Sequence, residues 1–307
     1  MRAQEEKFRG VRGLPAKSAQ RSAARVDSLA GWARIIVCGA LILLVPMLKV
    51  SVVQYLNTVP MIWGMLRGEQ QGKYELEFTT PAACADAVRQ RTADIGIVPV
   101  IEYQRMERMQ ILAGISIAAK DEVKSVLLLS KVPIAKIQNV AVDNSSRTSA
   151  ALLRVLMRKF YSRFISVRPA APRPEEMLKQ ADAALVIGDV ALSYNGDVPE
   201  IYDLAAEWKK CTGLPFVFAF WAGHEDAKLG KYREDFEDSL RFGLAHVDEI
   251  AAEYAPKLNM KPPGVKNYLT RNIDYSLDEE NRKGLRLFYK LAREAGIIPV
   301  EKDLYFA

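Results

Sequence analysis

The side chains best suited to binding an anion occur in one hydroxyl-rich segment, residues 143–149. The segment reads Asp-Asn-Ser-Ser-Arg-Thr-Ser and lies between an apolar run at 140–142 and a helical pattern at 150–157. A strand-to-helix turn is therefore expected, and the first backbone N–H groups of the helix would lack internal partners. The helix dipole would add partial positive charge there. The candidate donors are the hydroxyls of Ser145, Ser146, Thr148 and Ser149 and the guanidinium of Arg147, which can grip a carboxylate with two parallel hydrogen bonds.

The same residue types also suit an ordinary helix cap. Ser, Thr, Asn and Asp are all preferred at the position where a helix begins, because their side chains accept from its free N–H groups. Residue types alone support the two interpretations equally. Features elsewhere in the chain are needed to distinguish an anion pocket from a cap.

A second polar group, Tyr55, Asn57 and Thr58, follows the β-rich run 49–53. Asn57 or Thr58 can cap a helix that has Pro60 in its first turn. Ligands in open α/β sheets bind at the carboxyl ends of strands, so we expect this group to face the ligand. The alternatives are a core position for Tyr55 and a purely capping role for Asn57.

Strands alternate with helices from residue 48 onward, which predicts an α/β fold built from parallel βαβ units. Two units of similar size follow each other, joined by strand-like segments near 125–130 and 214–222. This arrangement predicts two lobes, two crossings between them and a ligand cleft in between. The expected strands are 49–53, 74–79, 94–100, 111–118, 125–130, 140–142, 164–167, 183–190 and 216–221, and the later expected helices are 148–161, 174–180, 228–254, 262–271 and 278–295.

The division of the chain follows from these patterns. We expect residues 1–46 to be an N-terminal extension, either disordered or the product of an over-extended gene start. Residues 47–126 and 222–307 would form lobe one, and 127–221 lobe two. The apolar run 35–48 resembles a short signal or anchor, but it is shorter than the roughly 20 residues that a spanning helix needs.

Composition excludes several function classes. The net charge of +6 comes mostly from the basic N-terminal segment, and no basic stripe with interleaved aromatic residues follows, so nucleic-acid binding is not expected. The three cysteines are far apart and form no CxxC pair, which argues against a disulfide framework or a zinc site and fits a reducing compartment. Neither of the two histidines lies in a metal-binding or nucleophile motif, and no metal site is expected.

Four motifs, in this order, are similar to those of one known family: Tyr55–Pro60, Ala93–Tyr103, Ser145–Ser149 and Leu214–Ala219. Together they resemble the chorismate dehydratase family of the futalosine route to menaquinone, over about residues 48–298. That family has the fold of type II periplasmic solute-binding proteins, with two α/β lobes, a ligand cleft between them and a two-strand hinge. The resemblance thus implies the same architecture that the periodicity predicts.

The resemblance also implies a reaction. The family removes water from chorismate to give 3-[(1-carboxyvinyl)oxy]benzoate, a hydro-lyase step that needs no metal or organic cofactor. Asn57 would lie at the reacting centre. An amide is a poor base, so Asn57 would orient the substrate or assist proton transfer, while the substrate's own enolpyruvyl carboxylate takes the ring proton. The implied substrate contacts are Tyr55, Thr58, Ser145, Ser146, Arg147, Thr148 and Ser149.

The chain departs from the family pattern at Pro81–Ala85, where a serine is expected and the sequence reads Pro-Ala-Ala-Cys-Ala. Thr79 and Thr80 are the candidates to replace the missing hydroxyl. The expected partner is chorismate, in the cytoplasm, with no stable membrane association; assembly into a homodimer is left open. Two other functions stay open: the sister enzyme that makes 1,4-dihydroxy-6-naphthoate, which the Ser-Ser-Arg-Thr-Ser segment disfavours, and a non-enzymatic protein that binds an anionic solute.

Overall fold

The computed structural model of the protein describes residues 34–37, 40–43 and 47–307. Ahead of the main body, β1 (Arg34–Val37) and β2 (Ala40–Leu43) pair as an antiparallel two-stranded sheet. The remainder of the predicted N-terminal extension lies outside the described residues. Within the described ranges, no helix is both long and apolar enough to cross a membrane.

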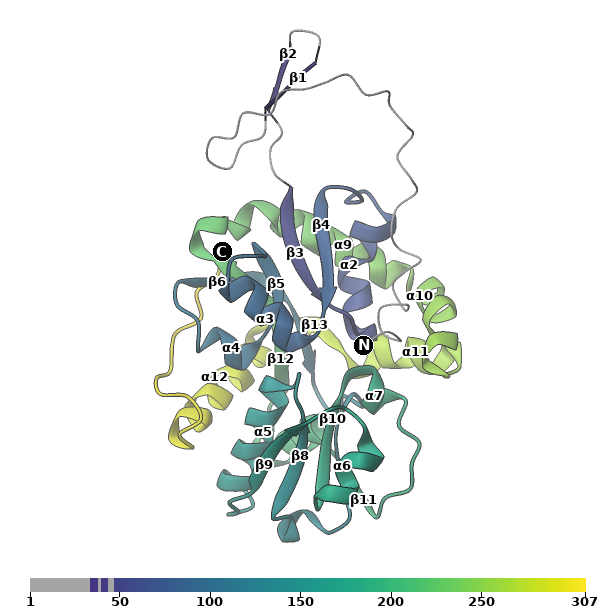
Figure 1. Cartoon of the computed structure of the whole chain (residues 1–307), viewed down its shortest axis with the longest axis vertical. Coiled ribbons are helices and arrows are strands. Elements are labelled where there is room, and N and C mark those ends of the chain that lie inside the picture. The colour runs from purple at the N-terminus through teal and green to yellow at the C-terminus, as the bar shows by residue number, and fades with distance from the viewer. Residues whose placement is uncertain (1–33, 38–39, 44–46) are drawn as a thin grey trace.

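The first lobe is built on a six-stranded mixed sheet in the order β13-β6-β12-β5-β3-β4 (Figure 1). β3 is parallel to β4 and β5, whereas β12 is antiparallel to both β5 and β6. The central strands are almost wholly apolar because helices cover both faces of the sheet. The strands are β3 (Leu48–Val53), β4 (Tyr74–Thr79), β5 (Ile95–Pro99), β6 (Met109–Ala119), β12 (Phe216–His224) and β13 (Asp274–Ser276).

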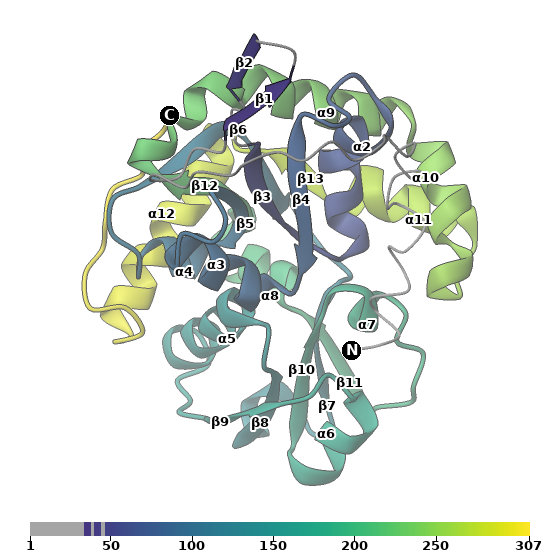
Figure 2. The ribbon, with the colours of Figure 1, turned by 45° about the horizontal axis from the view of Figure 1, so that its top comes forward.

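Helices from both ends of the chain surround this first sheet (Figures 1 and 2). The N-terminal half supplies α2 (Val59–Arg67), α3 (Pro81–Arg89) and α4 (Val100–Tyr103). The C-terminal half supplies α9 (Arg233–Ala245), α10 (Val247–Tyr254), α11 (Pro262–Asn267) and α12 (Glu279–Glu294). A single long helix over 228–254 was expected, but it divides at His246, where ψ is 25°. No proline marks this break, so the sequence contains no signal for it.

The second lobe is a five-stranded sheet in the order β11-β7-β10-β8-β9. β8 is parallel to β9 and β10, and β7 is antiparallel to β10 and β11. The strands are β7 (Val126–Ser130), β8 (Asn139–Asp143), β9 (Ser166–Ala170), β10 (Ala183–Ile187) and β11 (Glu200–Asp203), and the helices are α5 (Arg147–Lys159), α6 (Pro174–Gln180), α7 (Gly188–Leu192) and α8 (Leu204–Thr212).

The predicted two-lobed α/β architecture is confirmed, with the chain passing twice between the sheets. It leaves the first sheet after β6 and enters the second at β7, and it returns between α8 and β12. The expected boundary at residue 221 falls inside β12, whose partners β5 and β6 belong to the first sheet. We therefore propose to place the second boundary just before Phe216. Strands β11 and β13 and helices α7 and α8 were not predicted, and α7 replaces the last part of the strand expected over 183–190.

Candidate active site

A cavity of about 570 Å³, part of which is open to solvent, lies between the two lobes. It is formed at the carboxyl ends of β3, β5, β8 and β10, the position at which open α/β sheets bind ligands. Its mostly apolar wall with a few polar groups is typical of a small-molecule site. Much of the wall is apolar and can accept a ring, with contributions from Val53, Ile97, Ile117, Val126, Ile187 and Phe218.

One end of the cavity is the N-terminus of α5. The backbone N–H groups of Arg147, Thr148 and Ser149 have no hydrogen-bond partner among the described residues. Ser146 precedes them, its side chain does not cap the helix, and its buried hydroxyl is likewise unpartnered within the described ranges. Since buried donors are normally satisfied, this end of the cavity is suited to a carboxylate. The alternative prediction, that these hydroxyls cap the helix, is not supported, because no side chain caps the first turn of α5.

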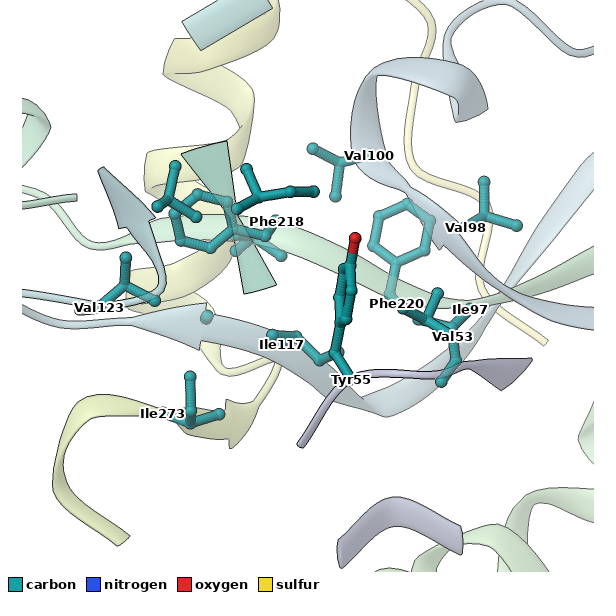
Figure 3. Packing of buried hydrophobic residues seen from close by; sticks show 14 of the residues in the cluster. Val53, Tyr55, Ile97, Val98, Val100, Ile117, Val123, Phe218, Phe220 and Ile273 are labelled. Atoms are coloured by element: carbon teal, nitrogen blue, oxygen red, sulfur yellow. The ribbon is translucent and has the colours of Figure 1, made fainter. Parts of the chain in front are cut away.

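Tyr55 reaches across the cleft to the same segment. It lines the cavity together with Val53, Ile117 and Phe218, and in the view of Figure 3 its ring stands between Ile117 and Val53. The Tyr55 hydroxyl is 3.3 Å from the Ser145 hydroxyl, which donates to Asp143 Oδ1 at 2.8 Å. Because Ser145 gives its proton to Asp143, Tyr55 is the donor to Ser145. Tyr55 thereby takes part in a polar chain that ends at a buried carboxyl.

Asp143, at the end of this chain, has an unusual environment. Its Oδ1 accepts from the Ser145 N–H at 2.9 Å as well as from the hydroxyl, while the buried Oδ2 has no partner in the described part of the chain. Burial raises the pKa of the Asp143 carboxyl above its ordinary value, and the hydrogen bonds from Ser145 oppose that rise. Burial, together with the nearby Asp143, also raises the pKa of Tyr55, which keeps the phenol protonated at neutral pH.

Asn57 lines the cavity from the 3₁₀ turn Leu56–Thr58 that follows β3. Its side-chain oxygen is shielded from solvent and has no hydrogen-bond partner among the residues described. Leaving a buried acceptor unpaired is costly, and a ligand that donates to it would remove that cost. Asn57 is therefore an unfilled acceptor in the cavity wall.

Arg147 lines the cavity, but its guanidinium binds protein carboxylates. It donates to both oxygens of Asp86, at 2.9 and 2.7 Å, and to Glu102 at 3.0 Å. Asp86 and Glu102 belong to the first lobe and Arg147 to the second, so these contacts join the lobes. The hydrogen bonds from Arg147 hold the pKa of Asp86 below its ordinary value. These contacts use three of the five N–H donors of the Arg147 guanidinium.

Two further predicted contacts turn toward the protein instead of the cavity. The Thr58 hydroxyl donates to the carbonyl oxygens of Val53 and Tyr55, the latter at 2.8 Å, and Thr58 is not part of the cavity wall. The Thr148 hydroxyl accepts from the Ile101 N–H of the other lobe at 3.3 Å, although Thr148 does line the cavity. Of the two threonines proposed to replace the missing serine, neither lines it, and Thr80 caps α3.

Gly188, which the carboxyl-end rule predicts at the cleft, and two residues that the sequence did not single out, Ser125 and Tyr268, complete the site. Gly188 lies in the wall with φ at +61°, and a Cβ added there would be 2.7 Å from the Tyr55 ring. Ser125 lines the cavity and accepts from the buried Tyr268 hydroxyl at 2.8 Å. A positive-φ glycine after a buried strand was a usable signal for Gly188, but nothing local indicates Ser125 or Tyr268. Across the described ranges, no group of three or more His, Cys, Asp or Glu residues is arranged to hold a metal ion.

Comparison with known proteins gives consistent results. The model of a family described as menaquinone biosynthesis matches residues 48–294. A chorismate dehydratase of Thermus thermophilus is 30% identical over 224 residues, which is 64% of this chain and 79% of the relative. A chorismate dehydratase of Campylobacter jejuni is 28% identical over 204 residues, 66% of this chain and 77% of the relative.

Solved structures show the same fold at low sequence identity. A crystal structure of an Archaeoglobus fulgidus protein superposes with a TM-score of 0.65 at 17% identity, covering 82% of this chain and 98% of that one. The periplasmic aliphatic sulphonate-binding protein of Escherichia coli gives a TM-score of 0.55 at 13% identity, with 85% and 96% covered. The predicted periplasmic-binding-protein-like fold is confirmed.

Proposed function

The chain belongs to the menaquinone-biosynthesis family, and from that membership we propose that it is a chorismate dehydratase. As a hydro-lyase it would convert chorismate to 3-[(1-carboxyvinyl)oxy]benzoate and water. The names of the two relatives support this assignment. The free thiols of Cys84 and Cys211 are consistent with a cytoplasmic enzyme, the location we propose.

The observation that carries the proposal is the unsatisfied N-terminus of α5 in an otherwise apolar cavity. Three backbone N–H groups and the Ser146 hydroxyl, all without a partner among the described residues, lie there and suit one carboxylate of chorismate. The apolar wall suits the ring. The second carboxylate, on the enolpyruvyl group, would then lie toward the first lobe, where Asn57 lines the cavity.

In this arrangement the protein itself supplies neither the proton acceptor nor the driving force of the reaction. Loss of water makes the ring aromatic, so the driving force is in the substrate. The enzyme must hold the substrate in a reactive conformation, exclude water and assist the movement of one proton. We propose that the enolpyruvyl carboxylate takes the ring proton and passes it to the departing hydroxyl, which leaves as water.

Incubation of the purified protein with chorismate tests the function. We expect the aromatic product to accumulate without added metal or cofactor, as followed by chromatography and ultraviolet absorbance. Protein inactivated by heat provides the control for spontaneous decay of chorismate. Decay at the same rate with native and inactivated protein would refute the assignment.

Substitution of Gly188 by alanine is expected to weaken chorismate binding, raising KM about fivefold, because the new methyl group would push the Tyr55 ring out of the cleft. The matched control is Gly213→Ala. Gly213 also has positive φ, +73°, but has no atom within 4 Å of an added Cβ. Both variants should lose about 1 kcal/mol of stability in thermal unfolding, from the left-handed backbone alone. Equal KM values for the two variants would show that chorismate binding does not depend on the position of the Tyr55 ring.

A further inference from the structure

The turn that carries Asn57 is bonded at its first residue to the opposite lobe. Leu56 begins the 3₁₀ turn Leu56–Thr58 of the first lobe, and its backbone N–H donates to Asp189 Oδ1 at 2.9 Å. Asp189 belongs to the first turn of α7 in the second lobe, and both residues are buried. The side chain of Tyr55, which precedes the turn, does not cap it. The second lobe thus supplies the cap, and a carboxylate suits the N–H at the start of a helical turn.

Further hydrogen bonds of this turn stay within the first lobe. The Thr58 hydroxyl donates to the Tyr55 carbonyl at 2.8 Å, and the Thr58 N–H donates to the same carbonyl at 3.1 Å. Tyr275, on β13, donates its hydroxyl proton to the Asn57 carbonyl at 3.0 Å. Of these bonds, only the one between Leu56 and Asp189 crosses from one lobe to the other. It therefore sets the position of the turn relative to the second lobe.

Asp189 belongs to a segment that is itself held in place. Its neighbour Gly188 donates its N–H to the Ser125 carbonyl at 2.8 Å, directly before β7. The Asp189 carbonyl accepts from the Ser193 N–H at 3.0 Å within α7. This helix lies at the end of the second lobe that faces the first (Figures 1 and 2). The carboxylate consequently meets the Leu56 N–H from a fixed position.

We propose that Asp189 is a positioning residue, which from the second lobe holds the 3₁₀ turn of the first and thereby fixes Asn57 in the cavity wall. Asp189 is not part of the cavity wall and acts through the backbone of Leu56.

The position of this turn matters for the reaction assigned under the proposed function, on which this inference rests. One substrate carboxylate binds at the N-terminus of α5 in the second lobe, while Asn57 acts from the first. Rates depend steeply on the distance between a bound substrate and the group that acts on it. The bond from Leu56 to Asp189 ties the Asn57 turn to the lobe that carries α5. It therefore fixes the distance between the group that binds the substrate and the group that acts on it.

Steady-state kinetics of Asp189→Ala test this assignment. We expect kcat for chorismate to fall about tenfold, because Asn57 is then less firmly placed, while KM changes less than about threefold, because the N-terminus of α5 is intact. The matched control is Asp94→Ala. Asp94 accepts the Lys49 N–H at 2.8 Å at the amino end of β3, the end of that strand remote from the turn. Its replacement should leave kcat and KM within about twofold of the wild type.

A second variant keeps the size of the side chain. Asp189→Asn is expected to lower kcat less than the alanine variant, about threefold, because a neutral amide oxygen accepts a weaker hydrogen bond than a carboxylate. Wild-type kcat in both variants would overturn the assignment. So would a rise in KM at constant kcat, which is the result expected if Asp189 only joins the lobes.

A double-mutant cycle separates positioning from general destabilisation. If Asp189 acts through Asn57, Asp189→Ala has no further effect on kcat in an Asn57→Ala background. An equal loss of kcat in both backgrounds would show that Asp189 acts by another route.

The contact itself can be tested without substrate. In protein labelled with ¹⁵N-leucine, the Leu56 backbone signal is identified by its absence in Leu56→Met. Its amide proton should shift upfield in Asp189→Ala, because the charged acceptor is lost, and stay unchanged in Asp94→Ala. An unchanged signal in Asp189→Ala would refute the contact. If the wild-type protein leaves chorismate untouched, the proposed function fails, and this measurement still decides whether Asp189 holds the turn.

Discussion

Replacement of Asn57 by alanine is expected to lower kcat for chorismate about a hundredfold, with a much smaller change in KM. Removal of one group that stabilises developing charge or proton transfer has effects of roughly this size in other enzymes. The side chain ends in an unpartnered oxygen in the cavity wall, while its backbone carbonyl is held by Tyr275. The alanine variant keeps that backbone contact, so the loss should be confined to the substrate. Initial rates over a range of chorismate concentrations provide the measurement.

The control for this substitution is Asn144→Ala. Asn144 lies in the hydroxyl-rich turn 143–149, is exposed and does not line the cavity. Its replacement should leave kcat and KM within about twofold of the wild type, as for most exposed positions. Near-normal turnover by Asn57→Ala would eliminate Asn57 from the reaction.

The local elements of the fold could be predicted because their signals are local. β3 and β5 are apolar runs that end in polar or proline residues, and α2 and α3 both have a proline in their first turn. The hydroxyl-rich turn 143–149 could also be predicted, because strand, turn and helix follow each other directly in the sequence. Because ligands in open α/β sheets bind at the carboxyl ends of strands, the sequence also predicts Tyr55 and Asn57 on the opposite side of the cleft from that turn.

The contacts that give each polar side chain its direction could not be predicted. Tyr275, whose hydroxyl donates to the Asn57 backbone carbonyl, is 218 residues from Asn57, and its local sequence does not indicate what its hydroxyl meets. The Thr58 hydroxyl bonds to the backbone carbonyls of its own turn. The partners of Arg147 could not be predicted either, because an arginine in a segment suited to anions also pairs with any protein carboxylate that folding brings near.

For Arg147, we expect the alanine variant to raise KM for chorismate about ten- to thirtyfold. Arg147 contributes the one second-lobe cation in a group around Glu102, which also receives hydrogen bonds from Arg89 and Arg105. Burial would raise the pKa of Glu102, but these arginines hold it below its ordinary value. Loss of Arg147 leaves Glu102 paired within its own lobe, so the first lobe should stay folded. The charge-assisted bonds that join the lobes would be lost, and the cleft would close less readily.

Asp86→Asn distinguishes two possible functions of Arg147: joining the two lobes, or binding a carboxylate of the ligand. If Arg147 holds the lobes together, loss of the Asp86 charge weakens closure and raises KM severalfold, with little further effect in an Arg147→Ala background. If Arg147 instead binds a substrate carboxylate, the same substitution frees the guanidinium and lowers KM. Glu237→Gln is the control, because Glu237 pairs with Arg233 inside one lobe and its side chain is 36% exposed, as is that of Asp86. Because Arg147 already donates to both Asp86 oxygens, at 2.9 and 2.7 Å, we expect KM to rise in Asp86→Asn and to stay constant in Glu237→Gln.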